Sequence, residues 1–337
     1  MKIFFLLIFF TIAIVQAKAQ VTDVATFQET AASFTKKGDY DNAILVLNKA
    51  LSLEPGNKAV LKDILFTSFL KRDFAKARDI GETLIKRPDA DAQTYQMLGS
   101  TYNAIAENKE AEKLYKNGIK KFPNEGVMYA EYGKLLSDKN TDDALKLFEK
   151  GIEADANHSS NYYYVAKLYA QKGEILWSLL FGEMFINIES FSGRSTEIKN
   201  LLLDQYKQFY LTAPDKTYSQ SKATDFTKMV AKVLSDQQQQ AIFGLTPESL
   251  TAIRTRFVLT WYYSNAKQYP FRLFDQQRQL LREGLFDAYN QWLFGPPSNL
   301  ASYQLWQKYH INDFNEYMAF VKSKIFKIPE GQQYKVF

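Results

Sequence analysis

The sequence of 337 residues predicts an all-α protein built from stacked pairs of helices. Apolar residues follow a helical period almost to the C-terminus, and strand patterns are nearly absent. The first half also carries an internal repeat, because alanines recur at spacings of 34, 34 and 33 residues: Ala43, Ala77, Ala111 and Ala144. A fixed period of this length is typical of a two-helix repeat that stacks into a solenoid.

Other positions keep the same period. Four residues after each alanine stand Leu47, Gly81, Tyr115 and Phe148, and seven residues after it stand Ala50, Leu84, Gly118 and Gly151. Near the end of each repeat stand Pro55, Pro88, Pro123 and Ala156. Small residues allow two helices to cross closely, and a proline cannot continue the helix that precedes it. The pattern therefore predicts helix crossings at the small positions and a helix end near each proline.

The most complete repeat is residues 92–125, which carries Tyr95, Leu98, Gly99, Tyr102, Ala111, Tyr115, Gly118 and Pro123. This segment resembles a tetratricopeptide repeat (TPR), and the resemblance extends over about half the chain. It implies a right-handed helical solenoid of about five repeats: 24–57, 58–91, 92–125, 126–158 and 159–192.

The N-terminus predicts an exported protein. Residues 1–19 combine a basic start at Lys2, the apolar run Ile3–Val15 and a small-residue cleavage site at Ala17-Lys18-Ala19, as a signal peptide does. The sequence contains no cysteine, which excludes disulfides, cysteine metal sites and a lipid-modified cysteine. We therefore expect a soluble bacterial periplasmic or secreted protein without a stable membrane anchor.

Residues 193–337 are predicted to form an aromatic-rich, all-helical region. The expected helices are Thr196–Leu211, Lys222–Gln240, Pro247–Lys267, Asp275–Phe294, Leu300–His310 and Asp313–Ile325, with a break at Gly295-Pro296-Pro297. Before them, Gly173–Ser190 is apolar all round, and a helix of this kind is buried on more than one side. We expect the C-terminal region to pack on this helix and to cap the last repeat. Glu183 and Glu189 interrupt it, and we expect each to pair with an arginine or to turn to the solvent side. The alternative is an acid with a perturbed pKa and a functional role.

Composition and motifs argue against several functions. The net charge is +5, from 42 basic and 37 acidic residues, which is no footprint for nucleic acid. The two histidines, His158 and His310, lie far apart, and the common motifs of nucleophilic, nucleotide-binding and zinc enzymes are missing. We expect no enzyme, no cofactor and no metal, although a pair of carboxylates brought together by folding stays open.

The TPR resemblance implies a scaffold that binds a partner peptide or helix on the concave face, formed by the first helix of each repeat. The residues predicted for that face are Gln28, Lys62, Phe66, Gln96, Ser100, Asn103, Lys134, Tyr163 and Lys167. The three lysines favour a peptide with some acidic character. TPR domains that clamp a C-terminal carboxylate use a lysine and an asparagine on the first repeat, where Gln28 and Ala32 stand here, so that mode is not expected. The groove could also hold the chain's own C-terminal region.

A second hypothesis concerns the aromatic residues of the C-terminal region. A small ligand or glycan could bind in a pocket that these aromatics line together with an arginine. The residues predicted for that site are Arg254, Trp261, Tyr263, Tyr289 and Trp292. The competing interpretation is that these side chains form a core.

Overall fold

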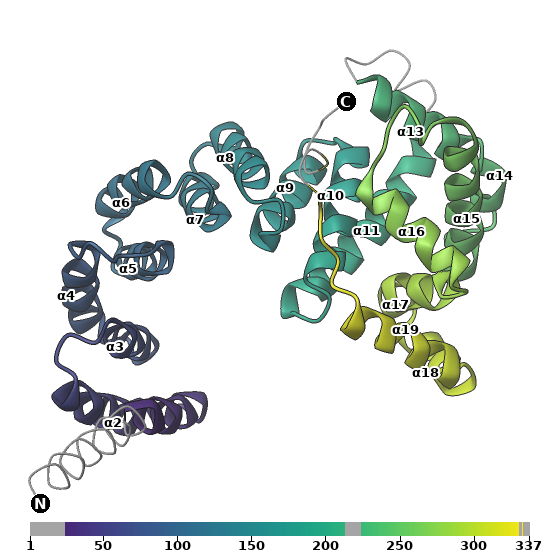
Figure 1. The fold of residues 1–337 in the computed structure, drawn as a ribbon. Coiled ribbons are helices and arrows are strands. Elements are labelled where there is room, and N and C mark those ends of the chain that lie inside the picture. The colour runs from purple at the N-terminus through teal and green to yellow at the C-terminus, as the bar shows by residue number, and fades with distance from the viewer. Residues whose placement is uncertain (1–23, 213–223, 330–331, 333–337) are drawn as a thin grey trace, which may run out of the picture. The chain divides into compact units, whose positions relative to one another are not determined.

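The computed structural model describes residues 24–212, 224–329 and 332 (Figure 1). Every regular element in these segments is a helix, as the sequence predicts. The predicted signal peptide, residues 1–19, lies outside the described residues, as does the predicted helix start at Lys222. Among the described helices, none has the length and apolar character that crossing a membrane requires.

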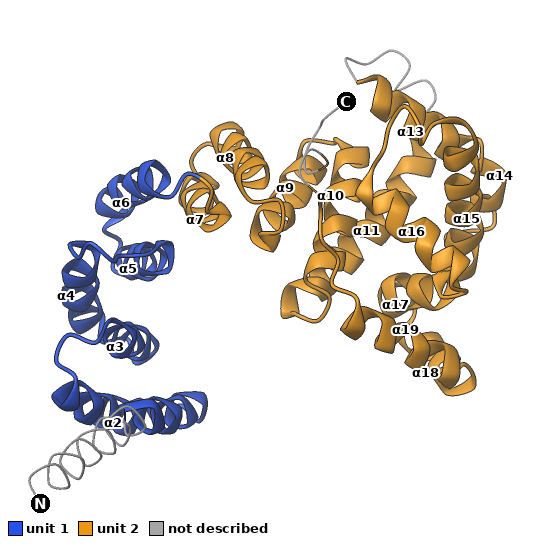
Figure 2. Ribbon diagram, viewed as in Figure 1, with its two compact units in different colours: residues 1–123 blue, residues 124–337 orange. Residues whose placement is uncertain are grey.

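The chain divides into two compact units, residues 1–123 and 124–337 (Figure 2). In unit 1, residues 24–36 form a first helix. It is followed by α2 (Tyr40–Leu53), α3 (Lys58–Leu70), α4 (Phe74–Ile85), α5 (Ala92–Ala104) and α6 (Asn108–Lys121). From α2 onward each helix packs on the next, and α3 also contacts α5. Unit 1 is therefore a stack of helix pairs.

Unit 2 continues with two helix pairs and then a helical bundle. The pairs are α7 (Gly126–Leu136) with α8 (Thr141–Ala154), and α9 (Ser159–Gln171) with α10 (Ile175–Ile188). The bundle comprises α11 (Gly193–Leu211), α13 (Asp225–Ser235), α14 (Gln238–Ala241), α15 (Pro247–Ser264), α16 (Arg272–Arg282), α17 (Phe286–Ser298), α18 (Leu300–Tyr309) and α19 (Ile311–Ser323). The five repeat boundaries themselves stay a prediction.

The small residues that recur in the sequence lie where helices cross. The side chains of the four periodic alanines, Ala43, Ala77, Ala111 and Ala144, are 0% exposed. At Gly133 an added Cβ would come within 2.6 Å of Cε1 of Phe148, and at Gly151 it would come within 2.5 Å of Nδ2 of Asn161. Both distances are shorter than van der Waals contact, so only glycine allows these helices to approach so closely.

Helix α10 is the centre of unit 2. Every residue from Ile175 to Ile186 is buried, and the helix contacts α9, α11, α13 and α16. One continuous core includes side chains from Ala144 to Ile328. The predicted burial of this helix on more than one side is confirmed, and the bundle packs directly on α9 and α10.

Three of the predicted helix boundaries are wrong. The predicted helix Lys222–Gln240 is interrupted between α13, which ends at Ser235, and α14, which begins at Gln238. The predicted helix Asp275–Phe294 is two helices, α16 and α17, because the chain turns at Gly284, whose φ of +73° favours glycine. The predicted break at Gly295-Pro296-Pro297 is absent, since α17 runs to Ser298. Pro296 has no N–H for the carbonyl of Trp292, four residues before it. Nζ of Lys199, on α11, donates to that oxygen at 2.9 Å instead.

Candidate protein-binding groove

Helices α3 and α5 of unit 1 line an open groove of about 650 Å³. The lining residues are Lys58, Ala59, Lys62, Asp63, Phe66 and Phe69 from α3, and Gln93, Gln96, Met97 and Ser100 from α5. Four of them, Lys62, Phe66, Gln96 and Ser100, were predicted from the sequence. The ring of Phe66 is a large apolar surface at this groove, and the residue is 47% exposed.

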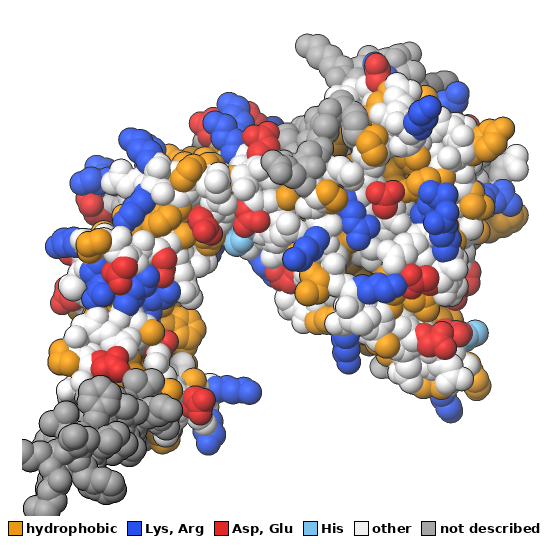
Figure 3. Space-filling model, in the orientation of Figure 1, with side chains coloured by type: hydrophobic (Ala, Val, Ile, Leu, Met, Phe, Trp, Pro, Cys, Tyr) orange, Lys and Arg blue, Asp and Glu red, His pale blue; other side chains and the backbone are white. Residues whose placement is uncertain are grey.

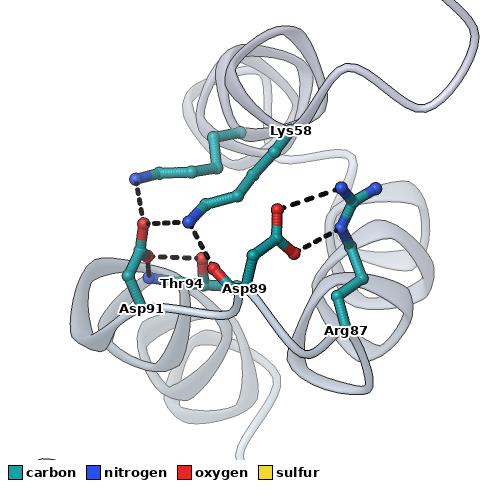
Figure 4. Close-up of polar contacts among 6 residues, drawn as sticks. Lys58, Arg87, Asp89, Asp91 and Thr94 are labelled. Carbon is teal, nitrogen blue, oxygen red and sulfur yellow. Dashed lines mark hydrogen bonds and ion pairs between the residues drawn. The ribbon is translucent and has the colours of Figure 1, made fainter.

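One end of the groove carries an ionic cluster centred on Asp91 (Figure 4). Nζ of Lys58 and Nζ of Lys62 each lie 2.9 Å from Oδ2 of Asp91. The other oxygen, Oδ1, accepts hydrogen bonds from the backbone N–H and the hydroxyl of Thr94, at 2.9 and 2.7 Å. Asp91 is therefore also the N-cap of α5. Burial raises the pKa of Asp91, but the hydrogen bonds from Lys58, Thr94 and Lys62 outweigh it and hold this pKa well below its usual range.

The turn that carries Asp91 is held by further contacts. Arg87 donates to both carboxylate oxygens of Asp89, at 2.8 and 3.1 Å (Figure 4). It also donates to the carbonyl of Gly56 at 2.8 Å. Nζ of Lys58 donates to the backbone carbonyl of Asp89. These contacts tie the end of α4 to the starts of α3 and α5, so the groove wall is preformed.

The groove carries charges of both signs. Lys62, predicted to favour an acidic partner, already pairs with Asp91. The next residue of α3, Asp63, accepts a hydrogen bond of 2.7 Å from Nε2 of Gln28, which was also predicted for this face. The large apolar side chains that line the groove are Phe66, Phe69 and Met97. The arrangement therefore suits a partner that inserts an apolar side chain better than it suits a partner that is recognised by its charge.

The remaining predicted groove residues do not line this groove. Asn103 lies one turn beyond Ser100, and its Nδ2 donates to the hydroxyl of Tyr115 at 3.3 Å. Lys134 is exposed on α7 of unit 2. The hydroxyl of Tyr163 donates to Glu197 of α11, and Nζ of Lys167 lies 2.6 Å from Glu197. Helix α11 therefore occupies the face of α9 on which these two residues stand.

Some groove residues were missed in the sequence. Phe69 and Met97 are on the predicted helices, one turn after Phe66 and directly after Gln96, so helical geometry could have indicated both. Asp91 comes from the segment between two repeats. Its pairing with Lys58 and Lys62 depends on how neighbouring helix pairs stack, which no local pattern reveals.

Four of the five residues of the alternative ligand site are buried inside unit 2. Arg254, Trp261, Tyr289 and Trp292 are all buried, whereas Tyr263 is 93% exposed. The cavity beside Arg254 has a volume of only about 20 Å³, which is room for one water molecule. A site for a glycan or another small ligand is therefore not favoured here.

Glu183 within α10 and Glu189 at its end both pair with arginines, which is one of the two arrangements expected from the sequence. Glu183 forms a buried ion pair with Arg254 and accepts hydrogen bonds from Gln277 and Tyr289, at 2.8 and 2.7 Å. Burial alone would lower the pKa of Arg254, but the Glu183 carboxylate raises it above its ordinary value. At the end of α10, Arg194 donates to both oxygens of Glu189.

Other features add no chemistry. Within residues 24–212 and 224–329, no three His, Cys, Asp or Glu side chains are grouped so that they could hold a metal ion. On the face seen in Figure 3, basic and acidic side chains are interspersed on each unit. The described surface in this view therefore has no face of a single sign.

Parts of the chain are similar to known proteins. Residues 31–57 match the tetratricopeptide repeat. The chain is similar in structure to TTC0263, a thermophilic TPR protein of Thermus thermophilus, at 16% identity and a TM-score of 0.46, over 53% of this chain and 99% of the other. It is also similar to YrrB, described as a TPR protein with an unusual peptide-binding site. The identity is 20% and the TM-score 0.36, over 56% of this chain and 97% of the other.

A third similar structure is PilF of Pseudomonas aeruginosa, at 14% identity and a TM-score of 0.46, over 77% of this chain and 98% of the other. With TM-scores below 0.5 and identities below 25%, no function is transferred from these proteins. The fold is all-α, a TPR-type solenoid followed by a helical region. TPR proteins generally mediate protein–protein interactions.

Proposed function

We propose that this protein is a non-catalytic interaction scaffold that binds a partner peptide or helix in the groove between α3 and α5. The observation that carries the proposal is Phe66, a phenylalanine left 47% exposed at a groove of about 650 Å³. Fully burying an exposed side chain of this size contributes about 1.5–3 kcal/mol. Because Phe66 is already about half buried, a partner that covers it with its own apolar side chain would gain roughly half of that free energy.

The proposal extends to location. Residues 1–19 have the features of a signal peptide, and we infer that the scaffold works in the cell envelope after export. The test is the N-terminal sequence of the protein isolated from its own cells. A chain that begins at Gln20 would support export, and a chain that still begins at Met1 would refute it.

The binding proposal is tested with peptides selected from a random library on the purified protein. Phe66→Ala should weaken binding of the selected peptides by at least about tenfold, as expected when an aromatic anchor is lost. Fluorescence anisotropy with labelled peptides measures the change. Phe66 is preferable to Lys62 as the site of substitution, because Lys62→Glu would place two like charges beside each other at Asp91.

The matched control is Tyr263→Ala, which removes another exposed aromatic side chain outside the groove. It should leave peptide binding unchanged. Equal affinity of the wild-type protein and Phe66→Ala for every selected peptide would show that the groove is not the binding site.

A further inference from the structure

The segment after α19 is an extended strap that lies on unit 2. We call residues 324–329 the C-terminal strap; Figure 1 draws it in yellow after α19. Its side chains alternate, since Phe326 and Ile328 are 6% and 4% exposed whereas Ile325 is 79% exposed. Alternation of this kind is a property of extended chain. The strap is therefore docked by every second side chain.

Side chains of unit 2 bind the main chain of the strap. The backbone N–H of Ile328 donates to Oδ1 of Asn157 at 3.0 Å. The backbone carbonyl of Lys327 accepts a hydrogen bond of 3.0 Å from Nε of Arg272. Asn157 belongs to the turn between α8 and α9, and Arg272 is the first residue of α16. These bonds hold an extended backbone whatever side chains it carries.

Two further contacts involve side chains of the strap. The guanidinium of Arg272 lies 4.7 Å from the ring centroid of Phe326, and it also donates to Oε1 of Gln276 at 3.1 Å, which fixes its position. Nζ of Lys324 lies 2.8 Å from Oε1 of Glu283, at the end of α16. The surface thus selects an aromatic ring and a lysine two residues before it.

We propose that this surface is a second peptide-binding site, separate from the α3–α5 groove, and that the chain's own strap occupies it. Main-chain hydrogen bonds combined with sites for alternate side chains are how proteins recognise extended peptides. The partner that fits is an extended segment of another protein with the strap's pattern, Lys-x-aromatic-x-aliphatic. Such a segment replaces the strap when the strap leaves.

The test keeps the protein folded before the strap is freed. A protease recognition sequence is inserted between Ser323 and Lys324, and the folded protein is cut there. A fluorescent peptide with the sequence of residues 324–332 is then added. The cut protein should exchange its strap for the peptide and bind it saturably, while the uncut protein should bind it at least about tenfold more weakly.

Matched peptides test the pattern without altering the protein. A peptide with Phe326→Ala and Ile328→Ala should bind at least about tenfold more weakly, and a peptide with Ile325→Ala should bind as the original does. On the protein, Asn157→Ala should weaken uptake and Phe66→Ala should leave it unchanged. Failure of the cut protein to take up the peptide, or equal binding of all three peptides, would overturn the proposal.

Discussion

Lys199 shows how one buried side chain supplies the hydrogen bond that a proline removes from a helix. Its Nζ donates to the carbonyl that Pro296 leaves without a partner, and it lies 3.4 Å from the ring centroid of Trp292. Among the described residues no carboxylate forms an ion pair with it. Burial therefore lowers the pKa of Lys199 to about 7.

This pKa makes the stability of the protein depend on pH. In the unfolded chain a lysine titrates near 10.4. Between about pH 7 and pH 10 the folded state therefore binds fewer protons than the unfolded state, so Lys199 makes the free energy of unfolding rise with pH. Urea denaturation followed by tryptophan fluorescence at pH 7 and pH 9 should show a larger rise for the wild type than for Lys199→Met. Equal rises would contradict the assignment.

At the scale of elements, the sequence predicted those features of the helices that depend on a local pattern of residues. The 34-residue period predicts the helix pairs, and the all-round apolar character of α10 predicts its burial. The continuation of α17 through Pro296 could not be predicted, because Lys199, which bonds the carbonyl of Trp292, is 93 residues away from Trp292 in the chain. The site divides in the same way. The resemblance to the tetratricopeptide repeat implied Phe66 and Gln96, whereas Asp91 joined the groove only through the stacking of neighbouring helix pairs.

The turns within the helix pairs repeat as well. The same turn position has a positive φ at Gly38, Arg72, Ala106 and Gly173, with values from 60° to 79°. This left-handed conformation suits glycine and costs other residues roughly 1 kcal/mol. Arg72 and Ala106 therefore occupy strained turns, which the sequence did not reveal because neither residue is typical of such a position.

The strained turn at Ala106 predicts that an alanine-to-glycine substitution there changes the free energy of unfolding in the opposite direction to the same substitution within a helix. Ala106→Gly should raise the free energy of unfolding by about 0.5–1 kcal/mol, since glycine adopts this φ without strain. The same substitution at Ala32, exposed in the middle of the first helix, should lower it by about 0.5–1 kcal/mol. Urea denaturation followed by far-UV circular dichroism measures both. A loss of stability at both positions would show that the turn at Ala106 is unstrained.

At the scale of the whole molecule, each unit has cores of its own. In unit 1, Ala43, Leu47, Ile64 and their neighbours form one cluster, and in unit 2 a single core includes residues from Ala144 to Ile328. The ion pair of Glu183 and Arg254 lies inside the larger core and joins α10 to α15. Breaking it should therefore act on unit 2.

All four tryptophans, at positions 177, 261, 292 and 306, belong to unit 2, so their fluorescence reports the unfolding of that unit. Glu183→Gln leaves the Arg254 charge buried without its partner, which costs about 3–5 kcal/mol. The fluorescence-detected midpoint in urea should fall accordingly. The double variant Glu183→Leu, Arg254→Met removes both charges and should recover most of the loss.

Circular dichroism detects helices of both units, so it separates an effect on one unit from an effect on both. The part of the dichroism change that does not follow tryptophan fluorescence reports the unfolding of unit 1. Because the substitutions lie in the core of unit 2, this part should keep its wild-type midpoint in urea. If that part shifts together with the fluorescence in Glu183→Gln, the two cores unfold as one cooperative system. If the double variant is no more stable than Glu183→Gln, the cost of the single substitution does not arise from an unpaired buried charge.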